Sequence, residues 1–147
     1  MTDVLISLHS GFRWIVLIAL IAAIVNAIMK SNSKAEFTEK DAKLNFITAM
    51  IVNLQVIGGL VLYFISDKVQ FNELTMEVDA LRFFAIEHIF GMILATALIS
   101  IGNGKSKRKE GSKAKFKATY VFYGIGLVII LLTIPWPFRE ALGGGWF

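Results

Sequence analysis

Cysteine is absent from this chain of 147 residues. Its absence excludes disulfides, thiolate zinc sites, iron–sulfur clusters and haem attached covalently through a Cys-x-x-Cys-His motif. The sequence also lacks a phosphate-binding loop, a nucleophile motif and a zincin pattern, so we predict no catalytic residue and leave open whether the protein is an enzyme. Charge is scarce, because only 18% of the residues are Asp, Glu, Lys or Arg and these lie in short segments. This composition is not that of a soluble globular protein.

Long apolar segments make up most of the chain, of which 56% is hydrophobic. A membrane-spanning helix needs about 20 apolar residues, and four spans are predicted at residues 4–29, 44–65, 80–101 and 118–135. The loops between them are short. We therefore predict an all-α integral membrane domain, residues 1–147, folded as an up-and-down four-helix bundle in which the first and third helices are parallel and diagonal.

Basic residues alternate with acidic ones from loop to loop. Residues 31–43 and 102–117 hold most of the lysines, whereas residues 66–79 are acidic. The positive-inside rule places the two basic loops in the cytoplasm, so we predict a protein of the inner (cytoplasmic) membrane of a bacterium with both termini outside. The net charge of +4 then reflects membrane topology, and the lipid bilayer rather than a nucleic acid is the expected partner.

The fourth span is followed by aromatic and glycine-rich sequence. Pro135 and Pro137 stop the helix, and Trp136 fits the aromatic belt of a membrane interface. Residues 143–147 are expected to form a flexible end, or to dock their two aromatic side chains on the surface or on a partner.

The chain has only two histidines, and each lies inside a predicted span beside a charge and a glycine. His9 belongs to the stretch Leu8-His9-Ser10-Gly11-Phe12-Arg13-Trp14, and His88 to Glu87-His88-Ile89-Phe90-Gly91. An arginine inside a bilayer helix costs roughly 2.5–3.5 kcal/mol on insertion scales, so the fold must compensate it. Both histidines fall in the outer half of the bilayer, at depths that differ by about 6 Å.

This pair permits a haem held between diagonal helices. The diagonal of a bundle is roughly 11–14 Å, which two imidazoles and one metal can fill. We predict His9 and His88 as the axial ligands of one b-type haem, and Gly11 and Gly91 as the residues that leave room for the ring. The anionic propionates would need cations near the outer surface, for which the candidates are Arg13, Arg82 and Arg139.

With these residues the chain resembles the small four-helix membrane cytochromes b, in which histidines on separate spans hold a haem and pass electrons to or from a quinone. The resemblance extends over the whole chain in topology, and at residue level over Leu8-His9-Ser10-Gly11 and Glu87-His88 with Gly91. It implies haem b, electron transfer and a quinone as partner. Two-haem members carry two histidine pairs, so the single pair here implies a single haem.

Two other interpretations stay open. An Arg13–Glu87 ion pair, with the histidines bonded to backbone carbonyls or to Gln55, would satisfy every buried polar group without a cofactor. The protein would then be an accessory subunit of a larger membrane assembly or a homo-oligomer. The third interpretation is a proton or ion path, for which Asn26 and Asn53 are the only candidates in the inner half.

Overall fold

The computed structural model describes residues 2–146, which fold into helices joined by short loops. Four of the helices are long and apolar enough to cross a membrane, as the sequence predicts. Three of them are α1 (Thr2–Asn32), α2 (Glu39–Ile65) and α5 (Ser112–Thr133). The remaining one is a continuous helix, Asp79–Arg108, in which α3 (Asp79–Arg82) leads through a π-helical turn, Phe83–Glu87, into α4 (His88–Arg108).

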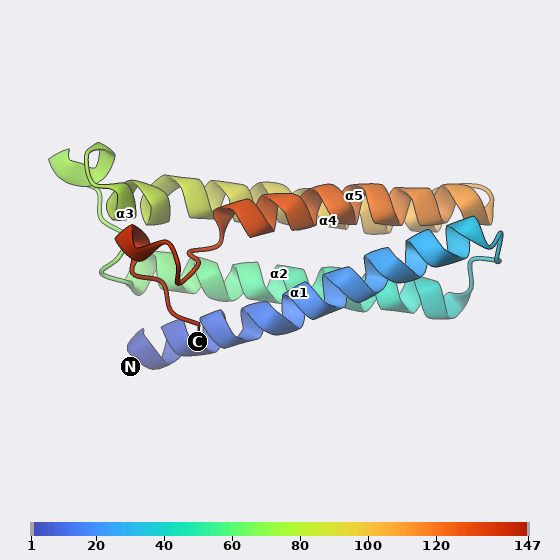
Figure 1. Cartoon of the computed structure of the whole chain (residues 1–147), viewed down its shortest axis with the longest axis horizontal. Helices are drawn as coiled ribbons and strands as arrows, with labels where there is room; N and C mark the ends of the chain where they lie inside the picture. The colour runs from blue at the N-terminus through green and yellow to red at the C-terminus, as the bar shows by residue number, and fades with distance from the viewer. Residues whose placement is uncertain (1, 147) are drawn as a thin grey trace.

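The helices form the expected antiparallel bundle (Figure 1). Each packs against two neighbours: α1 contacts α2 and α5, and α4 contacts the same two helices. The parallel helices α1 and α4 are therefore diagonal, which confirms the prediction for the first and third spans. We call the end where α1 begins and α5 stops the terminal end, and the opposite end, which carries the lysine-rich segments, the basic end.

The helices at the basic end are longer than predicted. The third membrane helix continues to Arg108, so the predicted loop 102–117 shrinks to residues 109–111 before α5 begins. Lysine and arginine form helices readily, and in the last turn of α4 their charge suits the negative, C-terminal end of the helix dipole. At the start of α2, Asp41 accepts hydrogen bonds from the backbone amide and the hydroxyl of Thr38, at 2.9 and 2.8 Å.

Polar side chains are buried in the half of the bundle near the basic end. Asn45 donates to Thr119 at 2.7 Å and to Ser106 at 3.4 Å, and the Tyr123 hydroxyl donates to the Asn45 carbonyl at 2.6 Å. All four residues are buried. Only Asn26 and Asn53 were predicted as polar candidates in this half, so this cluster is an addition from the structure. A proton or ion path nevertheless stays a prediction.

The segment after α5 folds back against the bundle. A 3-10 turn at Glu140–Leu142 reverses the chain, and the residues that follow return beside the start of α1 (Figure 1). The indole of Trp146 stacks on Trp14, with ring centroids 6.2 Å apart. Of the two expectations for this segment, docking describes Trp146, whereas Phe147 lies outside the described residues.

Candidate functional site

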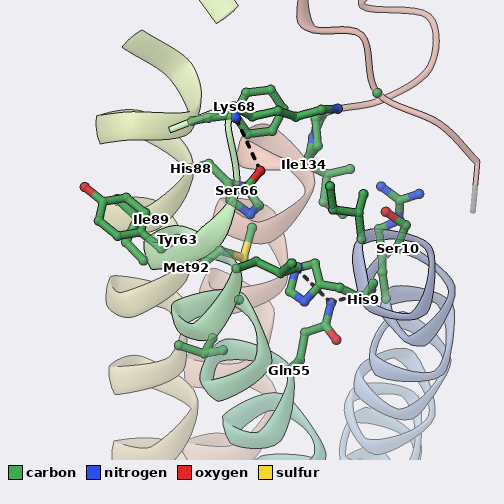
Figure 2. Close-up of a pocket in the computed structure, with 18 of the residues that line it drawn as sticks. His9, Ser10, Gln55, Tyr63, Ser66, Lys68, His88, Ile89, Met92 and Ile134 are labelled. Carbon is green, nitrogen blue, oxygen red and sulfur yellow. Dashed lines mark hydrogen bonds between the residues drawn. The ribbon is translucent and has the colours of Figure 1, made fainter. Parts of the chain in front are cut away.

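A cavity of about 150 Å³ lies between the helices in the half near the terminal end. One water needs roughly 10–15 Å³, so the cavity can admit a larger ligand. Side chains from all four membrane helices line it, and most are apolar. Both histidines are among them, and Figure 2 shows His9 and His88 in this hollow with Met92 near both. The structure thus brings together the two residues on which the sequence analysis depends.

His9 is positioned by α2. The Gln55 side-chain amide donates to the His9 backbone carbonyl at 2.9 Å and lies 3.4 Å from the ring nitrogen Nε2 of the same residue. One turn further along α2, Gly59 gives the imidazole its space. A methyl group at that position would lie 3.1 Å from His9 Cε1, closer than ordinary packing allows. Gln55 and Gly59 therefore act on His9 from one face of α2.

His88 is positioned by the end of α5. Its Nδ1 lies 2.7 Å from the carbonyl oxygen of Thr133, which is the last residue of that helix. A carbonyl can only accept, so Nδ1 carries the proton and Nε2 keeps its lone pair. Carbonyls in the last turn of a helix have no intrahelical partner. Here the His88 imidazole donates to one of these carbonyls. The sequence analysis missed Thr133, although Pro135 two residues later marks the end of the helix.

The two glycines predicted to leave room for a ring do not line the cavity. A Cβ at Gly91 would lie 2.5 Å from Thr133 Cγ2. The space beside Gly91 is therefore already filled by Thr133, and this glycine allows α4 and α5 to approach closely. At Gly11 an added Cβ would meet nothing within 4 Å. At Gly91 the glycine therefore allows close packing against Thr133 and does not leave room for a ring. At Gly11 no neighbouring atom explains the glycine.

Arg13 is buried at the cavity wall, but its partner is not the predicted one. Its Nη2 donates to the carbonyls of Gly145 and Trp146, at 2.9 and 3.0 Å. Glu87 instead accepts from Arg82 Nε at 2.9 Å. The predicted Arg13–Glu87 ion pair is therefore wrong, because a nearer cation neutralises Glu87 and the returning C-terminal segment supplies acceptors for Arg13.

The other two predicted cations lie outside the cavity. Arg82 bridges Asp79 and Glu87 near the surface. The Arg139 guanidinium lies 4.9 Å from the centre of the Phe83 ring. Lys68, which the sequence analysis did not select, lines the cavity and donates to the carbonyl of Gly143 at 3.2 Å. Arg13 and Lys68 are thus the two basic side chains at the cavity.

The chemistry of the site is limited by its ligand set. Within residues 2–146, no group of three or more His, Cys, Asp or Glu could hold a bare metal ion. Two imidazoles suffice for haem iron, because the macrocycle supplies the other four nitrogens. Two features of the site are of the kind that such a ligand needs: one imidazole has its lone pair fixed by a backbone acceptor, and the walls are largely apolar. No family model, curated protein or solved structure matches this chain.

Proposed function

We propose that this protein is a membrane-bound b-type cytochrome that holds one haem between His9 and His88. The single observation that carries the proposal is that the only two histidines in the sequence come from diagonal, parallel helices and line the same cavity.

The surroundings of His88 support a ligand role. Metal-binding histidines almost always donate their second ring nitrogen to a carbonyl, a carboxylate or water, which fixes the tautomer and makes the ligand more basic. The bond from His88 Nδ1 to the Thr133 carbonyl is of this kind. The π-helical turn that ends at Glu87 directly precedes this histidine, and such turns are frequent at functional sites.

His9 needs one local change to act as a ligand. The 3.4 Å separation between its Nε2 and the Gln55 amide exceeds the usual range of about 2.7–3.2 Å, so little is lost when this contact is released. Gln55 would keep its bond to the His9 carbonyl, which holds the backbone of α1 in place.

The chain provides the environment, and the haem, when bound, supplies one-electron chemistry. The walls are largely apolar, and Arg13 and Lys68 place positive charge beside the cavity. In the proposed topology the terminal end lies outside, in the inner membrane of a bacterium, because the lysine-rich segments lie at the opposite end. Exchange of electrons with a quinone and association with other membrane subunits stay predictions.

The test is a visible spectrum of the detergent-purified protein, reduced with dithionite minus oxidised in air, with a pyridine haemochrome assay to count haem. We expect a sharp reduced α-band and about one haem per chain for one axial pair. His9→Ala and His88→Ala should each abolish bound haem while the protein still inserts. Met92→Leu, a conservative change in the same cavity wall, is the matched control and should keep its haem. Full haem in both histidine variants would contradict the ligand assignment.

One observation favours a second candidate, a cofactor-free accessory subunit. The side chains of His88 and Arg13 each have a hydrogen-bond acceptor within the chain, and the His9 ring has a longer contact, 3.4 Å, with Gln55. A protein of this kind would purify colourless even when haem is supplied during expression. The same spectrum therefore decides between the two functions.

A further inference from the structure

The loop between α2 and α3 projects beyond the terminal end of the bundle (Figure 1). Large apolar side chains on and just before its 3-10 turn, Glu73–Met76, are exposed, although the Phe71 ring lies edge-on to Tyr63 with ring centroids 6.3 Å apart. Phe71 is 70% exposed, Leu74 53% and Met76 64%. We call residues 66–78 the projecting loop. Side chains of this size on a short, solvent-directed turn form an apolar tip that the rest of the described chain does not cover.

Acidic residues outnumber basic ones at the terminal end of the bundle. The basic residues at this end, apart from the buried Arg13, are Lys68, Arg82 and Arg139. The carboxylates there number seven, which gives a net charge of −4: Asp3, Asp67, Glu73, Glu77, Asp79, Glu87 and Glu140. Three of the carboxylates, Asp67, Glu73 and Glu77, belong to the projecting loop itself. None of the three forms an ion pair with another residue of the described chain. Their charge is therefore available to a partner.

The base of the projecting loop is part of the cavity. Ser66, Lys68 and Val69 line it together with the two histidines. The projecting loop is therefore continuous with the wall of the proposed haem site. This is the end of the bundle at which an electron could leave for a partner outside the membrane.

We propose that the projecting loop is the docking surface for a basic, soluble electron-carrier protein; this inference rests on the proposed function. An apolar centre with a charged rim is the usual anatomy of a protein interface, and a surface of one sign steers a partner of the other. A second copy of this chain would present the same acidic end, and anionic lipid would be repelled. Charge complementarity thus selects a cationic protein.

The experiment measures direct binding. The full chain is reconstituted in nanodiscs of zwitterionic lipid and titrated with a basic c-type cytochrome as the probe. We expect binding that weakens as ionic strength rises from about 20 to 200 mM, because exposed charges are screened. Glu73→Lys with Glu77→Lys should raise Kd about tenfold or more. The matched control, Glu36→Lys with Glu110→Lys, makes the same charge change at the basic end and should leave Kd within about twofold.

The apolar tip has its own variant. Leu74→Ser with Met76→Ser should weaken binding while leaving its salt dependence unchanged, since no charge is removed. Three results would overturn the proposal: no binding of the probe, equal binding to empty nanodiscs, or equal effects of the loop and control charge changes. The binding assay does not depend on haem. A featureless visible spectrum would therefore contradict the proposed function, whereas the docking proposal would still be decided by the measured Kd values.

Discussion

Gly58 and Gly59 are neighbours on α2 that differ in what they leave room for. A Cβ at Gly59 would come within 3.1 Å of the His9 ring, whereas at Gly58 the nearest atom, His9 Nδ1, is 3.9 Å away. We expect Gly59→Ala to displace the imidazole at a cost of about 1–3 kcal/mol and to lower haem content. Gly58→Ala, as the control, should change neither haem content nor thermal stability. Equal haem content in the two variants would show that the position of His9 does not depend on Gly59.

A second prediction concerns the contact between Gly91 and Thr133. Gly91→Ala would push against the Thr133 side chain and move the carbonyl to which His88 donates. We expect a lower melting temperature and a shifted haem spectrum. Adding Thr133→Ala to Gly91→Ala removes the Cγ2 and Oγ1 atoms in the way but keeps the backbone carbonyl, so the double variant should recover most of both signals. A double variant no better than Gly91→Ala alone would contradict this role for the glycine.

At this scale the sequence predicts which residues matter better than what they touch. The histidines and Arg13 stand out because polar groups are costly in an apolar span, and all three line the cavity. Their partners cannot be read in the same way. Thr133 lies 45 residues from His88, and the carbonyls that bind Arg13 lie 132 and 133 residues away. Such pairings depend on packing between helices, which no local pattern encodes.

Among the elements, the C-terminal segment depends on Arg13. Arg13→Ala would leave the Gly145 carbonyl without its donor and the Trp146 carbonyl with only the Trp14 indole, which donates to it at 3.1 Å. We therefore expect residues 143–146 to detach and to become sensitive to limited proteolysis. Arg139→Ala removes an arginine that stacks on Phe83 and should leave this segment protected. Equal protease resistance in both variants would mean that the contacts of Trp146 with Trp14 and the bond from Lys68 to Gly143 are enough to hold the segment.

Helix existence was predictable at this scale, and helix ends less so. All four spans follow from apolar length, yet the third membrane helix extends to Arg108 because its basic residues favour helix beyond the apolar segment. The π-helical turn before His88 was not predicted. One extra residue in a turn changes the hydrogen-bond pattern without changing the apolar composition, so hydropathy carries no sign of it.

For the whole molecule, the testable property is orientation. The absence of native cysteine lets a single introduced thiol report its own side of the membrane. We expect Asp67→Cys, at the terminal end, to react with a membrane-impermeant maleimide added to intact spheroplasts. Ser33→Cys, at the basic end, should react only after permeabilisation. The reverse labelling would invert the proposed topology and would place the projecting loop in the cytoplasm.

The diagonal arrangement of α1 and α4 was the most consequential prediction at the scale of the whole molecule. It follows from short loops alone, because short connections make consecutive helices neighbours. The return of the C-terminal segment did not follow, since a glycine-rich stretch has no pattern that specifies where it docks.

The bond between Arg13 and the carbonyl of Trp146 also has a consequence for biosynthesis. The two residues are 133 positions apart, so at roughly 5–20 residues per second Arg13 leaves the ribosome several seconds or more before its acceptor. During that interval the first span enters the membrane with an unneutralised guanidinium, at a cost of about 2.5–3.5 kcal/mol. The leucine and isoleucine residues around Arg13 must then supply the favourable free energy of insertion by themselves. The Arg13 guanidinium reaches its carbonyl acceptors only when the C-terminal segment packs against the bundle. The first span therefore reaches its final state at the end of assembly.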